Sequence, residues 1–147
     1  MSLKEIIKQL SRDFNLGFSE GEEVYSLSVN DLYEVYLEKS IEPHVFLLSA
    51  PVCLVPDKGA EETYRLLLEA NLYGEAMGQH VLAIDKGSDQ VVLFRWFNEL
   101  EISYAEFLDH LKCFVKQVAT WEEKIEGFPN HEKGEEELDN LNIGIKI

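Results

Sequence analysis

The fold that this sequence predicts is decided by residues 64–100, which read YRLLLEANLYGEAMGQHVLAIDKGSDQVVLFRWFNEL. Apolar residues recur at helical spacing through the first part of the stretch, and this predicts a helix. The apolar runs 80–85 and 91–100 then flank the turn 86–90, a pattern that is typical of a β-hairpin. A helix followed by a hairpin is therefore the centre from which the rest of the chain is interpreted.

The predicted helix carries two apolar stripes. One contains Tyr64, Leu67, Leu68, Asn71 and Leu72, and the other contains Leu66, Ala70, Tyr73 and Met77. A helix that rests on a sheet at a protein surface needs only one apolar face, so a second one indicates that something else covers it. We therefore predict a homodimer seam, with ordinary core packing as the alternative for each member: Leu66, Ala70, Tyr73, Met77, Phe94 and Trp96.

Outward from this centre, local signals define the other elements. A capping box at Ser2–Glu5 begins an amphipathic helix of about four turns, which we expect to stop at Gly17. Alternation of period two predicts strands from Val24 to Val29 and from Tyr33 to Glu38, and a more continuous apolar run predicts a third at 44–54. A second capping box at 103–106 begins a long helix that runs to about residue 126.

The predicted order is therefore α-β-β-β-α-β-β-α. We assign the fold class α+β, with a twisted antiparallel sheet flanked by helices in a homodimer, and we expect one domain over residues 1–126. Residues 127–147 differ, because they form an acidic tail that ends in alternating apolar residues. The sequence leaves open whether this end is a short edge strand, in this chain or another, or a flexible tail.

Composition limits the function classes. With 147 residues and 46% hydrophobic residues, the chain is long and apolar enough for one globular domain. A net charge of −15 opposes nonspecific binding to nucleic acid or to an anionic membrane, and is compatible with solubility, a basic partner or mimicry of nucleic acid. Cys53 and Cys113 are expected to be buried free thiols in a reducing compartment, with one long-range disulfide as the alternative. The sequence shows neither a signal peptide nor an apolar run of membrane-spanning length, so we expect a cytoplasmic protein.

No catalytic or metal site is predicted. Residues 17–21 match the pattern G-x-S-x-G, but here a helix precedes Ser19 and a strand follows, the reverse of the nucleophile elbow. We interpret this stretch as a loop that ends the first helix. His44, His80, His110 and His131 have none of the spacings that gather metal ligands. We therefore expect no enzyme activity and no cofactor.

The middle and closing segments resemble a known family. Its most telling stretches here are LLEANL at 67–72, VLAID at 81–85, VVLF at 91–94 and the closing helix from Phe107 to Trp121. With these motifs and this order of elements, residues 2–126 resemble the class I type III secretion chaperones, the Tir-chaperone-like family of small acidic homodimers. The tail after residue 127 goes beyond the family pattern.

The resemblance implies a mechanism without a reaction. Such chaperones use no ATP and hold an N-terminal segment of a secreted effector in an extended, export-competent form in the bacterial cytoplasm. The segment adds a strand to a sheet edge and inserts apolar side chains into grooves. The first helix and the meander are the parts that the seam leaves free. We therefore expect effector contacts, with core packing as the alternative for each, at Ile7, Leu10, Phe14, Tyr33, Val35 and Leu37.

Other partners and functions remain open. The export-apparatus ATPase is a further possible partner. The main alternative function is a non-secretory regulatory or immunity-type adaptor of the same fold, which would bind a folded protein. A small hydrolase that uses Ser19 is a third hypothesis. An acidic mimic of nucleic acid ranks last, because the acidic residues are spread over several elements.

Overall fold

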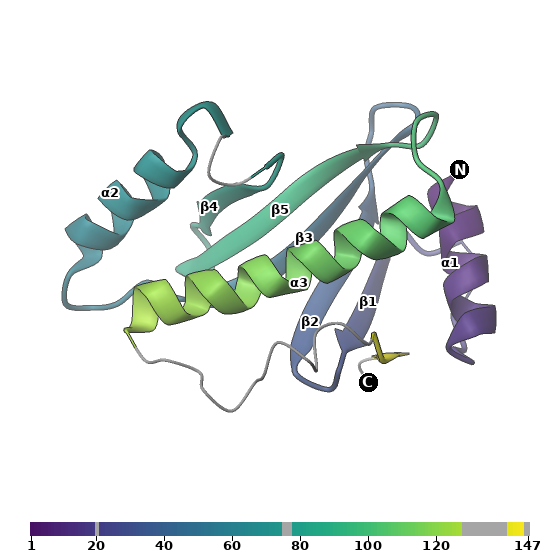
Figure 1. Ribbon diagram of the computed structural model, residues 1–147, viewed down its shortest axis with the longest axis horizontal. Helices are drawn as coiled ribbons and strands as arrows, with labels where there is room; N and C mark the ends of the chain where they lie inside the picture. Colours follow the sequence, from purple (N-terminus) through teal and green to yellow (C-terminus); the bar gives the residue numbers. More distant parts are fainter. Residues whose placement is uncertain (20, 75–77, 128–140, 146–147) are drawn as a thin grey trace.

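The computed structural model describes residues 1–147 except 20, 75–77, 128–140 and 146–147 (Figure 1). It is an α+β fold with the predicted order of elements, to which a single 3-10 turn and a short last strand are added. The elements are α1 (Leu3–Asp13), β1 (Val24–Val29), β2 (Tyr33–Lys39), β3 (Val45–Leu54), α2 (Ala60–Ala70), η1 (Leu72–Gly74), β4 (Val81–Asp85), β5 (Gln90–Asn98), α3 (Tyr104–Glu126) and β6 (Ile143–Ile145).

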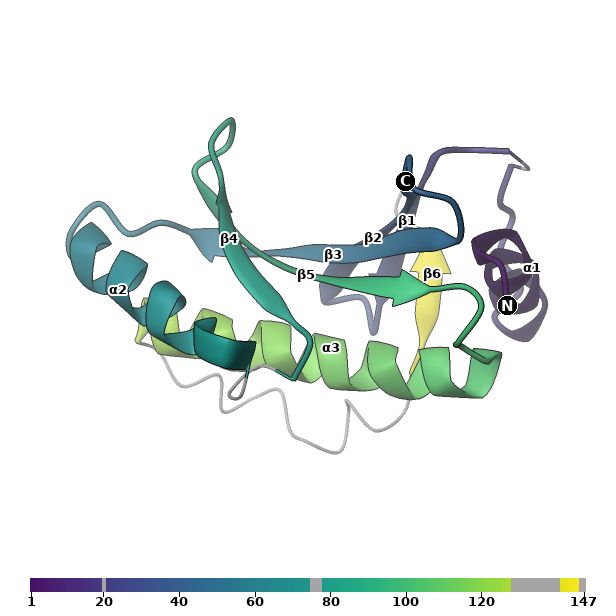
Figure 2. The ribbon, with the colours of Figure 1, turned by 90° about the horizontal axis from the view of Figure 1, so that it is seen from above.

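The six strands form one antiparallel sheet in the order β4-β5-β3-β2-β1-β6. The helix α3 runs along one face of this sheet, whereas α1 and α2 lie at opposite ends of the molecule (Figures 1 and 2). No helix among the described residues covers the second face of the sheet (Figure 2). We call the face against α3 the inner face and the other the outer face.

The core lies between α3 and the inner face. Period-two alternation places one side chain in two on that face, and the amphipathic α3 supplies the opposite layer. Phe46 stacks on Phe97 with ring centroids 5.1 Å apart, and Phe107 of α3 packs against both rings. All three aromatic side chains are buried, and burial of such rings contributes a large share of the apolar area that stabilises a core. The helix begins at the predicted Ser103 capping box, and a left-handed glycine, Gly127, ends it.

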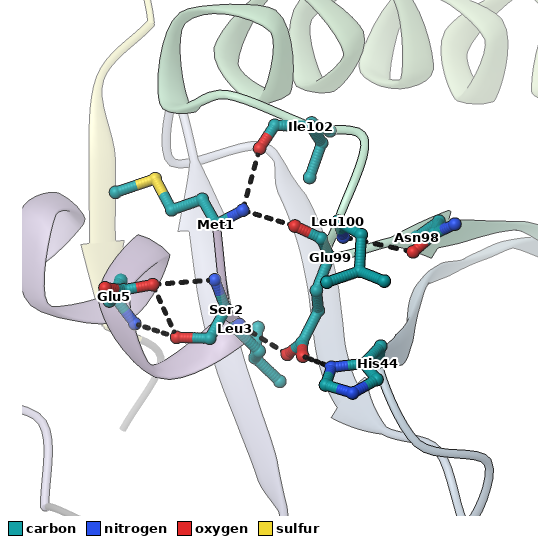
Figure 3. Close-up of polar contacts among 9 residues, drawn as sticks. All are labelled: Met1, Ser2, Leu3, Glu5, His44, Asn98, Glu99, Leu100 and Ile102. Atoms are coloured by element: carbon teal, nitrogen blue, oxygen red, sulfur yellow. Dashed lines mark hydrogen bonds and ion pairs between the residues drawn. The ribbon is translucent and has the colours of Figure 1, made fainter.

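The start of α1 is fastened to the turn between β5 and α3 (Figure 3). The Met1 ammonium group donates hydrogen bonds to the carbonyl oxygens of Glu99 and Ile102. The Leu3 N–H donates to Glu99 Oε1 at 2.7 Å, and Glu99 Oε2 lies 3.7 Å from His44 Nδ1. The Glu99 carboxylate therefore joins the first helix, the loop before β3 and the turn before α3.

Two predicted helix ends are wrong. The first helix ends at Asp13, before the expected stop at Gly17, because the chain leaves the helix at Phe14 and Asn15 has a φ of 53°. The second ends at Ala70, so Tyr73 lies outside α2, in a non-helical conformation with a φ of 56°. The predicted second stripe of this helix therefore does not continue past Ala70.

Residues Ile143–Ile145, after the acidic tail, form an edge strand of the chain's own sheet. Strand β6 pairs antiparallel with β1. The acidic run before it, like His131 and Ile147, falls outside the described residues. Both cysteines are free thiols. Cys53 is buried as expected, but the expected burial of Cys113 is wrong, because this residue lies on the solvent side of α3.

Candidate partner-binding surfaces

The outer face of the sheet carries an open apolar surface. Its centre is Trp96, which is 52% exposed and makes an edge contact with Phe94. The register places Leu47 opposite Trp96, and Val81 opposite Phe94. Val81 is exposed and Leu47 is half-buried. An apolar sheet face without a covering layer indicates a surface that meets another molecule.

A second open apolar surface lies on α2 and the turn after it. The helix buries Thr63, Leu67 and Ala70 against its own chain. Large apolar groups beside this buried side are exposed, namely Tyr64 at 41% and Leu68 at 73% on the helix, and Leu72 at 59% and Tyr73 at 87% in the turn after it. The helix has a buried and an open side, but the predicted stripes do not separate them. Leu67 of the first stripe and Ala70 of the second are both buried, whereas Tyr64 and Leu68 of the first stripe are exposed.

The side chain of Asn71 ties this helix end to strand β4. Asn71 Nδ2 donates to the Leu82 carbonyl oxygen at 2.7 Å, and Asn71 Oδ1 accepts from the Leu82 N–H at 2.9 Å. Leu82 is itself buried. The exposed side chains that follow Asn71 are therefore held next to β4. Val81, the residue before Leu82 on this strand, belongs to the outer apolar surface. The two open surfaces are linked through this amide.

A groove of about 920 Å³ lies where the β2–β3 loop meets the β5–α3 turn. We call it the corner groove; it is lined by Gln79, Ser40–Val45, Arg95–Asn98, Leu100–Ile102, Glu106 and His110. Its rim includes Ile41, which is fully exposed, and Leu100, which is 73% exposed. Trp96 also lines it, so the groove continues the outer apolar surface. Apolar side chains at the rim of a groove suit an extended segment with apolar anchors.

Arg95 and His110 form the polar part of the corner groove. Arg95 Nη1 lies 3.1 Å from His110 Nδ1, and Arg95 Nη2 donates to Gln79 Oε1 at 2.6 Å. A guanidinium group can only donate, so a hydrogen bond between these two groups makes His110 Nδ1 the acceptor. Burial and the nearby Arg95 charge lower the pKa of His110, although Glu106 and Asp109 oppose the shift. Burial also lowers the pKa of Arg95. The hydrogen bonds of this pair fix the orientation of Arg95, His110 and Gln79, and the pair contains no nucleophilic group.

A smaller groove of about 410 Å³ lies between α1 and the loop that follows it. We call it the α1 groove. Apolar groups at its wall include Ile7 and Phe18, and Phe18 makes an edge contact with Tyr25. Three of the chain's 13 basic residues line it as well, namely Lys4, Lys8 and Arg12. Ser19 lies here too, in the loop, and the residues that line this groove include no histidine to act as its base.

The structure places most of the predicted effector-contact residues in the core. Ile7 and Tyr33 are each 5% exposed, Leu10, Val35 and Leu37 have no exposed surface, and Phe14 is half-buried. Their alternation and helical spacing identified the apolar face of each element, and this face is the one that turns inward. Of the six, Ile7 lines a groove that a partner could enter.

The structure brings together part of the predicted seam. Phe94 and Trp96 share the outer face, and Tyr73 is exposed in the turn after α2. Leu66 is half-buried and Ala70 is buried in its own chain. Met77 falls outside the described residues. Sequence reasoning missed Ile41 and Leu100 as exposed apolar residues. Ile41 stands in a loop with no periodic pattern around it, and Leu100, which belongs to the apolar run 91–100, lies in the turn after β5 ends at Asn98.

The described residues show neither a metal site nor a membrane span. No group of three or more His, Cys, Asp or Glu side chains in the described part of the chain could hold a metal ion. Within the same residues, no helix is long and apolar enough to cross a membrane.

Solved structures with the same fold include type III secretion proteins. In the HopA1–SchA chaperone–effector complex, the matching chain is 12% identical with a TM-score of 0.65, covering 82% of this chain and 92% of its own. In the ExoU–SpcU complex from the type III secretion system of Pseudomonas aeruginosa, the matching chain is 16% identical with a TM-score of 0.66, covering 86% of this chain and 99% of its own. YbjN, a putative transcription regulator from E. coli, is 14% identical with a TM-score of 0.61, covering 84% of this chain and 90% of its own. At these identities the likeness shows the fold.

A comparison with curated protein sequences gives no match. A family model, however, matches residues 5–122, which run from the first turn of α1 through most of α3 and include the outer face, the corner groove and most of the α1 groove. The chain belongs to the Tir chaperone protein (CesT) family.

Proposed function

We propose that the chain is an ATP-independent chaperone that binds the N-terminal segment of a type III secreted effector in the bacterial cytoplasm and holds it extended for export. Family membership supports this function. So do the two similar structures whose descriptions name a chaperone–effector complex and a type III secretion system. Binding without catalysis agrees with the surfaces described above, which offer apolar anchors and grooves.

One observation carries the proposal: a member of a chaperone family leaves the apolar side chains of Ile41 and Leu100 open at the corner groove. Exposed apolar patches of this kind mark interaction sites in soluble proteins. The net charge of −15 favours solubility in spite of that surface. An apolar patch on a strongly acidic body suits a protein that receives a partly unfolded guest.

The proposed chaperone is a homodimer. The seam that we favour joins the exposed side of α2 to the outer face next to β4, with Leu68, Tyr73, Phe94 and Trp96 as its main contacts. Both surfaces are apolar and open, and Asn71 holds them next to each other. Burial of aromatic side chains at the centre of an interface is what stabilises it most.

The effector contacts are proposed at the two grooves. Because the predicted contact residues on β2 are buried, we place the contacts of an effector segment at the rims of the corner groove and the α1 groove instead. The corner groove offers Ile41 and Leu100, and the α1 groove offers Ile7 and Phe18 beside basic residues. A contact with the export-apparatus ATPase stays a prediction that rests on the resemblance alone.

The test begins with the partner that co-purifies with the tagged full-length chain from its own bacterium, identified by mass spectrometry. The partner's first ~100 residues, a domain-scale length, are then deleted, and the same residues are separately co-expressed with the chain. We expect the deletion to abolish binding. We expect the isolated segment to stay soluble with the chain and to remain sensitive to protease, as an extended segment would.

Surface variants give the matched control. Ile41→Asp and Leu100→Asp place charges on the rim of the corner groove, whereas Leu54→Asp changes an exposed leucine at the far end of β3. The first two should reduce capture of the segment at least ten-fold, and the third should leave it unchanged. Equal capture by all three variants would contradict the assignment of this groove.

The second candidate function is a non-secretory adaptor that binds a folded partner. The likeness to YbjN, a putative transcription regulator, favours it, because it shows that the same fold occurs in a protein described in other terms. In the deletion experiment, a partner that binds equally well without its N-terminal residues would support the adaptor and refute the export chaperone.

A further inference from the structure

We propose that β6 is a resident strand that occupies the β1 edge of the sheet, and that an extended segment of the partner must displace it. The inference rests on the proposed function, in which the partner adds a strand to a sheet edge, and adds to it the segment of this chain that competes for that edge. Its evidence is the position of β6, which lies outside the residues that the family model matches.

Strand β6 occupies the sheet edge as an added strand. Ile143 lies opposite Val29, Gly144 opposite Ser28, and Ile145 opposite Leu27. In sequence, β6 is separated from α3 by the acidic tail, yet it pairs with a strand from the beginning of the chain (Figure 2). This is the geometry by which one chain adds a strand to the sheet of another.

The pairing is continued beyond the three paired residues. The Asn30 N–H donates to the Asn142 carbonyl oxygen at 2.6 Å, and the Asn142 N–H donates to Asn30 Oδ1 at 2.7 Å. Asn30 is part of the β1–β2 turn, with a φ of 54°. The turn therefore holds the start of β6 and fixes its register on β1.

The site that β6 occupies beside β1 is apolar on the side that faces the core. Leu27 and Val29 have no exposed surface, and Ile143 beside them is only 3% exposed. Leu141 packs against the same core. If β6 left, the apolar edge of the core would face water, so the site demands an apolar replacement. A partner segment that binds here needs an apolar residue where Ile143 lies, and a second where Leu141 lies.

The middle position of β6, Gly144, places no steric limit on the size of the residue at its Cβ atom. A Cβ atom built on Gly144 would lie 4.0 Å from the Ser28 Cβ, which is an ordinary contact. The backbone of Gly144 therefore accepts any residue type that a strand allows. The chemistry that fits the edge is an extended segment with alternate apolar residues and with small or polar residues between them.

The opposite end of the sheet is closed in another way. At β4, the outward amide and carbonyl of Leu82 are both bound by the Asn71 side chain. An incoming strand would have to break both bonds. Of the two ends of the sheet, only the β1 end is held by a strand, and a strand can be exchanged for another strand with the loss of no backbone hydrogen bond.

Exchange is feasible because β6 is short. Three paired residues offer few backbone bonds, and the strand stays in place because it belongs to the same chain, which makes its pairing intramolecular at an effective concentration of about millimolar. A longer partner segment can make more pairs along the six residues of β1. The resident strand thus protects the edge in the free chaperone and gives way to a partner that pairs more extensively.

The test locks β6 in place. Ser28→Cys with Gly144→Cys, in a chain that also carries Cys113→Ser, puts two thiols on facing positions whose Cβ separation of 4.0 Å lies within the disulfide range. The reduced form of the same variant is the matched control. A second variant, Gly144→Pro, releases β6 because proline removes an amide donor from the middle of the strand. Thermal melts check that each variant remains folded.

The probe is a fluorescent peptide with the sequence of residues 141–147, measured by anisotropy on full-length protein. We expect the Gly144→Pro variant to bind it at least ten-fold more tightly than the wild type, and the oxidised lock to show no binding up to about 1 mM, the scale of the intramolecular effective concentration. Equal binding to the oxidised and reduced forms would overturn the proposal. So would an absence of binding to Gly144→Pro.

The effector segment found by co-purification gives an independent readout. We expect the oxidised lock to bind it at least ten-fold more weakly than the reduced form. If the oxidised lock binds the segment as tightly as the reduced form does, the docking edge is wrong but the chaperone function stands. If binding of the effector by the oxidised form, the reduced form and the wild type does not require the effector's N-terminal residues, the chaperone function itself is wrong.

Discussion

The amide of Asn71 gives the sharpest stability prediction. Its two hydrogen bonds, 2.7 and 2.9 Å long, satisfy both backbone groups of Leu82, a residue that is only 3% exposed. The change Asn71→Ala removes both partners at once. Each buried backbone group left without a partner costs about 1–3 kcal/mol. We therefore expect a loss of about 3 kcal/mol in the free energy of unfolding, because water will reach the exposed side of the helix end and satisfy part of the demand.

The assay is urea unfolding at one fixed protomer concentration, since a dimer's stability depends on concentration. For a chain of this size, a loss of about 3 kcal/mol corresponds to a fall of roughly 6–12 °C in Tm. Arg65→Ala on the same helix is the control, because the Arg65 side chain is 81% exposed, and it should change stability by less than about 0.5 kcal/mol. If Asn71→Ala stays within about 1 kcal/mol of the wild type, the bonds to Leu82 do not hold α2 to the sheet.

Three further predictions follow from the site. The change Trp96→Glu should convert the dimer to a monomer in analytical ultracentrifugation, because it buries a charge in the proposed seam; an unchanged dimer would refute that seam. The pKa of His110 is lowered in the folded protein, so the unfolded state binds more protons than the folded state as pH falls below the ordinary value of 6.5. The free energy of unfolding should therefore fall between pH 7 and pH 5. In a series of melts over this range, His110→Gln should reduce that fall. Cys113 should react with a thiol reagent in the native protein, whereas Cys53, whose pKa burial raises to about 11, should react only after denaturation; two fast thiols would contradict the burial of Cys53.

Local signals predicted the helix starts and most strands, because the information they need lies within a few residues. The capping boxes at Ser2 and Ser103 both form as expected, with reciprocal bonds to Glu5 and Glu106. The end of α2 was missed for a physical reason: the bonds of Asn71 to Leu82 cross to another element. No periodicity within the helix reports such a partner.

The candidate site was harder to predict than the fold. Spacing identified Leu10 and Val35 as apolar-face residues, but it could not tell which face the body covers, and both are fully buried. The exposed Ile41 stands alone in a loop and has no pattern to report it. For the tail, alternation predicted that a strand could form, and only the partner β1 determines where it pairs. Long-range pairing of this kind is specified by the whole fold rather than by local sequence.

The two ends of the sheet have a consequence for the behaviour of many copies at high concentration. Unpaired backbone groups along a long edge strand let identical molecules join edge to edge into fibrils. Here both edge strands are short, because β6 has three residues and β4 has five, and the Asn71 side chain already binds both outward backbone groups of Leu82 on β4. Few backbone groups are therefore left at either edge for another copy to pair with, and this disfavours edge-to-edge polymerisation.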